Sequence, residues 1–89
     1  MRAFEVYLNE ERLCVAGVGE DGVLNTMIDH IIGNNRNDLF MRTGGLLTQT
    51  MEHVMWATRD LKVGDEIRVR IVETDAVDPP LTRSRAPEE

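Results

Sequence analysis

Residues 61–73 have the sequence LKVGDEIRVRIVE, a charged turn followed by the clearest strand pattern in the chain. Side chains along a β-strand alternate between two faces. Apolar residues occupy one face of this segment and charged residues the other: Ile67, Val69 and Ile71 against Glu66, Arg68 and Arg70. The alternation predicts a half-buried strand of an antiparallel sheet, because a strand buried on both faces would be apolar throughout. We expect its apolar face to organise the core.

The turn before this strand contains Gly64 and Asp65. Glycine accepts a positive φ, and an aspartate side chain accepts hydrogen bonds from nearby backbone amides. Both residues therefore predict a tight turn between Leu61 and the strand.

Four further segments alternate in a similar way: Ala3 to Leu8, Arg12 to Val18, Leu39 to Leu47 and Met51 to Thr58. The first two are separated only by polar residues 9–11, which predicts a β-hairpin. In the third, Gly44 and Gly45 interrupt the alternation. A glycine pair inside a strand indicates a bulge or a close backbone approach, after which Leu46 and Leu47 are expected to return to the core.

The segment Val23 to Ile32, VLNTMIDHII, fits both a helix and a strand. Its apolar residues form one helical stripe, and Gly33 would be a suitable helix end. Its short length and β-branched content favour a strand, as does the extended character of the other segments. We predict a strand that pairs with the next one across a loop at residues 33–38, with a helix as the alternative.

Together these segments predict an all-β fold of five to six antiparallel strands, as a meander, a flattened sandwich or a small barrel. The alternative is an α+β fold in which Val23 to Ile32 forms a helix over the sheet. Residues 1–74 are expected to form a single β-rich domain. Residues 75–89 contain all three prolines and no apolar periodicity, which predicts a flexible C-terminal tail.

The charge and composition limit the possible functions. Ten Lys and Arg against sixteen Asp and Glu give the 89 residues a net charge of −6, which repels nucleic acid and anionic membrane surfaces. Cys14 is the only cysteine, so no intrachain disulfide is expected. The first residues lack the apolar run of a signal peptide, and we expect a cytoplasmic protein that does not associate with membranes.

The sequence carries no enzyme motif. His30 and His53 each follow a carboxylate, and the two pairs are the only candidates for a metal site. Neighbouring residues of a strand face opposite sides, so each acid and its histidine would not converge, and solvated histidines are the simpler interpretation. Cys14 lies in a predicted strand, where free cysteine is usually a small buried hydrophobe. We therefore expect no catalytic residues, no metal and no cofactor.

The sequence LKVGDEIRVRIVETD at residues 61–75 resembles the last strand of small Greek-key barrels, including the S1 type of nucleic-acid-binding OB domain. The resemblance is confined to this stretch and implies a nucleic-acid surface, for which Arg42, Arg68 and Arg70 are the candidate residues. Such binding also requires exposed aromatic rings and a basic groove, whereas the chain has only four aromatic residues. Nucleic-acid binding is thus the alternative function, and a small metal-binding protein with its site at His30 and His53 is the weaker alternative.

Two features favour self-association. Four methionines lie between residues 27 and 55, and clustered methionine is common in irregular cores and at adaptable interfaces. An open sheet also leaves edge strands that must be covered, charged or paired with another chain. We predict a non-enzymatic interaction module that forms a homodimer through sheet edges or faces, with a further protein partner as a possibility that the sequence leaves open.

Overall fold

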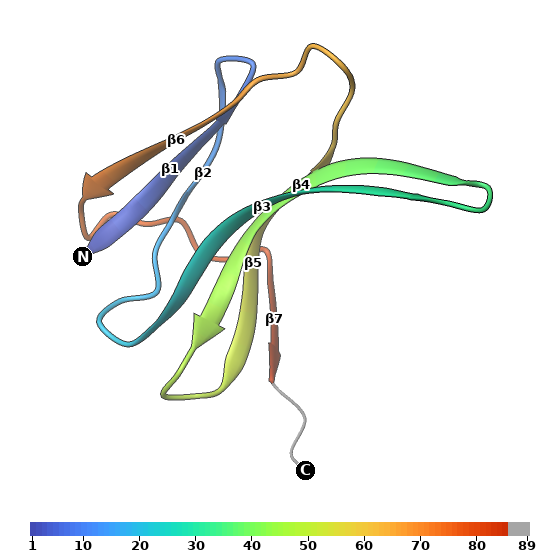
Figure 1. Ribbon diagram of the computed structural model, residues 1–89. Coiled ribbons are helices and arrows are strands. Elements are labelled where there is room, and N and C mark those ends of the chain that lie inside the picture. Colours follow the sequence, from blue (N-terminus) through green and yellow to red (C-terminus); the bar gives the residue numbers. More distant parts are fainter. Residues whose placement is uncertain (86–89) are drawn as a thin grey trace.

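The computed structural model describes residues 1–85, all of them in strands, turns or extended segments without a helix (Figure 1). The strands are β1 (Arg2–Leu8), β2 (Glu11–Ala16), β3 (Gly22–Gly33), β4 (Arg36–Leu47), β5 (Glu52–Asp60), β6 (Ile67–Glu73) and β7 (Thr82–Arg85). The predicted all-β class is confirmed, with one strand more than expected. The described residues contain no helix long and apolar enough to cross a membrane.

The helical alternative for Val23 to Ile32 is wrong, because every residue of this segment pairs with β4. The predicted loop after it is also shorter than expected. Gly33 pairs with Arg36, so only Asn34 and Asn35 remain in the turn, and Asn35 adopts the positive φ of +58° that closes it. The result is a hairpin of two long strands.

The strands form two antiparallel sheets. One has the order β2-β1-β6, and the other has the order β3-β4-β5-β7. The sheets approach each other most closely at β2 and β5, and they do not close into a barrel. The molecule is flat, with extents of 39 × 37 × 16 Å, which corresponds to the flattened sandwich among the predicted arrangements.

The core lies between the two sheets and contains few large side chains. It consists of Val6, Cys14, Ala16, Met41, Val54, Trp56 and Ala57. Thr43 is also fully buried, and its hydroxyl lies 2.9 Å from that of Thr26 on the neighbouring strand. This bond satisfies a polar group that would otherwise be costly to bury.

The turn before β6 is fastened to the β1–β2 hairpin, as its sequence suggests. Gly64 has a φ of +99°, and Asp65 Oδ2 accepts a hydrogen bond from the backbone amide of Lys62 at 2.8 Å. Asn9, in the hairpin turn, donates to Asp65 Oδ1 at 2.8 Å and accepts from the amide of Glu66 at 2.9 Å. The bonds from Asn9 and Lys62 hold the pKa of the Asp65 carboxyl at about 2.

The apolar face of β6 does not organise the core, contrary to the sequence-based expectation. Ile67 packs against the core, but Val69 and Ile71 are 38% and 70% exposed. The reason is topological: among residues 1–85, β6 pairs with β1 on one side only and is an edge strand. Periodicity identified which residues share a face, but not that most of this face has no strand above it.

The segment after β6, which the sequence predicts as a tail, crosses between the sheets. Asp78 accepts from the Val15 amide through Oδ2 and donates its own amide to the Val15 carbonyl, both at 2.8 Å. Its carbonyl accepts a 2.7 Å hydrogen bond from Trp56 Nε1. Farther on, β7 pairs with β5 from Thr82 to Arg85. Residues 86–89 of the predicted tail lie outside the described residues.

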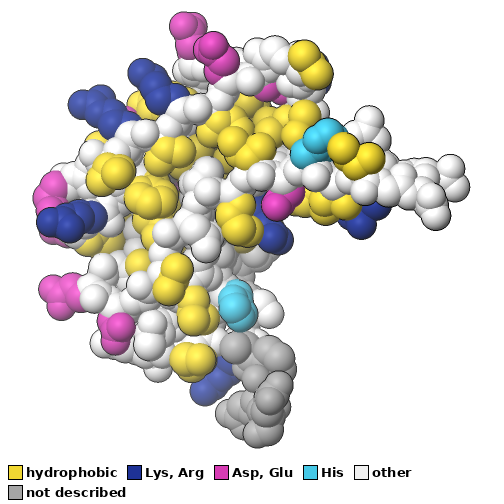
Figure 2. All heavy atoms as spheres, in the orientation of Figure 1, with side chains coloured by type: hydrophobic (Ala, Val, Ile, Leu, Met, Phe, Trp, Pro, Cys, Tyr) yellow, Lys and Arg dark blue, Asp and Glu magenta, His cyan; other side chains and the backbone are white. Residues whose placement is uncertain are grey.

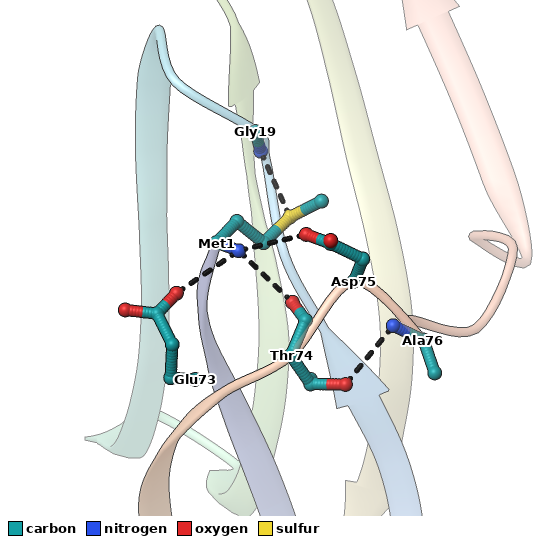
Figure 3. Close-up of polar contacts among 6 residues, drawn as sticks. All are labelled: Met1, Gly19, Glu73, Thr74, Asp75 and Ala76. Atoms are coloured by element: carbon teal, nitrogen blue, oxygen red, sulfur yellow. Dashed lines mark hydrogen bonds and ion pairs between the residues drawn. The ribbon is translucent and has the colours of Figure 1, made fainter.

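The first residue lies beside the end of β6 (Figure 3). The Met1 amine donates to the Thr74 carbonyl at 3.1 Å and lies 2.9 Å from Asp75 Oδ1 and 3.0 Å from Glu73 Oε2. The Asp75 and Glu73 carboxylates raise the pKa of this amine. Met1 Sδ accepts from the Gly19 amide at 3.3 Å, so these contacts connect β1, the β2–β3 loop and the segment after β6.

Candidate functional site

The four-stranded sheet has a groove of about 580 Å³ on the face that points away from the core. This volume lies within the range of ligand pockets, roughly 300–1,000 Å³. Its apolar lining comes from three strands: Val23, Met27, Leu46 and Met55. Its polar residues come from the same three strands and from β7: Asn25, Arg42, His53, Thr82 and Ser84. We call it the Gly44 groove, after the residue whose missing side chain leaves it hollow.

The glycine pair is required by the backbone. The register between β4 and β5 shifts at Thr43 and Gly44, which confirms the predicted bulge. A Cβ on Gly44 would lie 2.5 Å from the Val54 carbonyl oxygen, and a Cβ on Gly45 would overlap the carbonyl oxygen of Val23. The bulge therefore both excludes side chains here and creates the hollow.

The methionines divide between the core and the surface. Met41 is fully buried, whereas Met27 and Met55 line the groove on either side of Gly44. Leu47 packs against the core, but Leu46 lines the groove, so only one of these leucines returns to the core as expected. Flexible methionine side chains adapt to different binding partners.

Among residues 1–85, no carboxylate lines the Gly44 groove, although the chain is acidic overall. Arg42 forms no ion pair with any residue in the described part of the chain. His53 and Ser84 are cross-strand partners, but no hydrogen bond joins their side chains, as a nucleophile and its base would require. The groove suits binding of an apolar group.

The second candidate surface is the open edge of β3, which has no neighbour on the side away from β4 among residues 1–85. Pairing of β4 with β5 begins at Phe40. Beyond it, the two-stranded end of the β3–β4 hairpin projects from the body as an arm (Figure 1). We define the arm as residues 29–39.

Large apolar side chains are exposed along β3. Val23, Ile28 and Ile32 are 52%, 59% and 71% exposed. Figure 2 shows hydrophobic side chains gathered between β6 and the base of the arm. The 12 residues of β3 include no Lys, Arg or Pro, and Asp29 is their only acidic residue. Charged side chains, Lys above all, and Pro usually protect an edge strand from pairing.

The three arginines proposed for nucleic-acid binding do not meet. Arg68 and Arg70 pair with Tyr7 and Glu5 on the outer face of the three-stranded sheet, whereas Arg42 lines the Gly44 groove on the other sheet. Arg68 stacks on the Tyr7 ring at 4.3 Å. Arg70 and Arg12 each lie 3.9 Å from Glu5, so Arg12 joins this cluster although the sequence did not indicate it.

The two histidines also lie apart, as Figure 2 shows. His30 is on the arm, where its Nε2 lies 2.9 Å from Asn37 Oδ1, and His53 lines the Gly44 groove. Within residues 1–85, no group of three or more His, Cys, Asp or Glu lies close enough to hold a metal ion. Cys14 is 3% exposed, and burial raises the pKa of its thiol to about 11, so it is protonated at neutral pH.

Comparisons with protein families, with curated proteins and with solved structures found no match. The candidate surfaces are therefore assigned from their own geometry. The one sequence signal for the β3 edge is the absence of Lys, Arg and Pro over residues 22–33, and it becomes informative only once β3 is known to be an edge strand.

Proposed function

We propose that this protein is a non-enzymatic interaction module that associates with itself. The observation that carries the proposal is β3, an edge strand of 12 residues that has no partner on its outer side among residues 1–85 and has three large apolar side chains more than half exposed. Long apolar edge strands without Lys or Pro pair readily with another chain.

The small core supports the same proposal. Small domains bury a smaller fraction of their surface on folding than large ones, so a small core stabilises the folded state less. Here the buried members of the core include just one aromatic residue, Trp56. Association would bury apolar surface that the fold leaves exposed, and this burial contributes roughly 25 cal/mol per Å². The dimer would thus add to the stability of each copy.

Light scattering after size-exclusion chromatography tests the proposal. At high micromolar concentration we expect a species of twice the chain mass of 10.1 kDa, with dissociation towards the single chain on dilution. A single-chain species at every concentration would contradict the proposal.

Binding of single-stranded nucleic acid is the second candidate function. The observation that favours it is the stacked pair of Tyr7 and Arg68 with Arg70 and Arg12 nearby, since single strands bind through stacking and positive charge. A labelled oligonucleotide should then bind at low salt and be released as salt rises, and Arg68→Ala should weaken it while Arg42→Ala should not. No binding at low salt would remove this candidate.

A further inference from the structure

We infer that two copies of this chain pair their β3 strands antiparallel about a twofold axis at Ile28, which gives one continuous sheet with four strands from each copy. This inference rests on the proposed self-association and names its surface and register. Its support is the direction of the free backbone groups, the side chains on the edge, and the arm.

The backbone of β3 presents alternate residues to the open edge. Gly33 and Arg36 flank the two-residue turn, a position where the pair is hydrogen-bonded, and antiparallel pairs then alternate along the ladder. The odd-numbered residues therefore bond to β4, in agreement with the Val23 carbonyl, which points at Gly45. The even-numbered residues direct their amides and carbonyls outwards: Leu24, Thr26, Ile28, His30 and Ile32.

A twofold axis at Ile28 uses all of these groups. Leu24 then lies opposite Ile32 of the second copy, Thr26 opposite its His30, and Ile28 opposite its Ile28. Each hydrogen-bonded pair exchanges two bonds, so the ladder contains about ten, the number found in a typical protein interface.

The side chains are compatible with this register. On the core-facing side of the sheet, the apolar Leu24, Ile28 and Ile32 meet apolar partners, and Thr26 meets His30. On the other side, Asp29 lies opposite Met27, so no like charges are directly opposed. The edge of β6 behaves differently, because full-length pairing of two β6 strands would place Arg70 opposite Arg70.

The arm is the part of the molecule that this arrangement stabilises most. An isolated two-stranded hairpin is at best marginally stable in water, yet the arm extends beyond the ladder with β5 and exposes Ile32. In the dimer each arm lies along residues 23–27 of the other copy, where it becomes part of a wider sheet. Val23, Asn25 and Met27 line the Gly44 groove, so both grooves would lie on one face of this sheet.

Ile28→Lys and its matched control Ile71→Lys test the pairing by light scattering. Both replace an exposed isoleucine on an edge strand, so both should fold, as circular dichroism will verify. Only Ile28→Lys puts two ammonium groups opposite each other at the twofold axis. We expect it to raise the dimer dissociation constant on the order of 100-fold, whereas Ile71→Lys leaves it unchanged.

Oxidation of Ile28→Cys tests the register directly. Residues in a hydrogen-bonded antiparallel pair have Cα atoms about 5.5 Å apart, within the range for a disulfide. We expect a disulfide-linked dimer from Ile28→Cys and none from Ile71→Cys, with buried Cys14 unreactive in both.

The outcomes separate the two proposals. If the wild-type chain is dimeric, and Ile28→Lys stays dimeric while Ile28→Cys forms no disulfide, the β3 pairing is overturned and self-association stands. If the wild-type chain is a single chain throughout, self-association itself is overturned.

Discussion

The hydrogen bonds between Asp78 and Val15 give the sharpest stability prediction. Asp78→Ala removes the carboxylate that accepts the Val15 amide at 2.8 Å. Val15 is only 7% exposed, so its amide would be left without an acceptor and largely shielded from water. Breaking a hydrogen bond to a charged acceptor costs about 1.5–3 kcal/mol. The free energy of unfolding should fall by that amount.

For a domain of this size, 1 kcal/mol corresponds to about 4–8 °C in Tm, so Tm should fall by roughly 6–24 °C. Urea unfolding followed by the fluorescence of Trp56, the only tryptophan, measures the same change. All variants should be compared at one protein concentration, because association shifts apparent stability.

Two controls isolate the bond. Asp78→Asn keeps an oxygen acceptor and should lose less than about 1 kcal/mol. Asp21→Ala removes an exposed acid and should stay within about 0.5 kcal/mol of wild type. If Asp78→Ala also stays within that limit, residues 75–80 are not fastened to β2 and the assignment of this segment to the fold is wrong.

Two further predictions concern the core and the β6 turn. Met41→Ala, at a fully buried position, should lower the free energy of unfolding by about 2–5 kcal/mol, whereas Met51→Ala, at a 48% exposed turn position, should change it by less than about 0.5 kcal/mol; equal effects in urea unfolding would contradict the assigned core. Hydrogen bonds from Asn9 and Lys62 lower the pKa of Asp65 from 3.8 to about 2, so this carboxylate stabilises the fold above pH 3.8 and the stabilisation is lost as the pH falls towards 2. Asp65→Asn should therefore be less sensitive to pH in this window than wild type, and an identical pH dependence would show that the turn bonds do not form.

The sequence predicts local structure well where side chains alternate. The β1–β2 hairpin, the bulge at Gly44 and the turn at Gly64 all follow from residue types and spacing. For residues 23–32 both the helical and the strand period fit the apolar residues. Only the full-length pairing with β4 shows that the segment is a strand. This pairing depends on residues outside the segment, so the sequence of the segment alone does not predict it.

The candidate site was less accessible to prediction for the same reason. Alternation in β6 shows that Val69 and Ile71 share a face, but their exposure depends on which strands of the other sheet lie above them. β7, with the sequence TRSR, has no apolar residue and is defined only by its pairing with β5. Likewise, the open edge of β3 depends on strand order, and the Gly44 groove combines residues from four strands.

Amide hydrogen exchange along β3, measured by NMR at a concentration where the protein is dimeric, tests the central claim most directly. We predict protection of the outward amides of Leu24, Thr26, Ile28, His30 and Ile32, as strong as that of the odd-numbered amides bonded to β4. Fast exchange at these five positions beside protected odd-numbered neighbours would show that β3 remains an open edge, and would contradict the pairing.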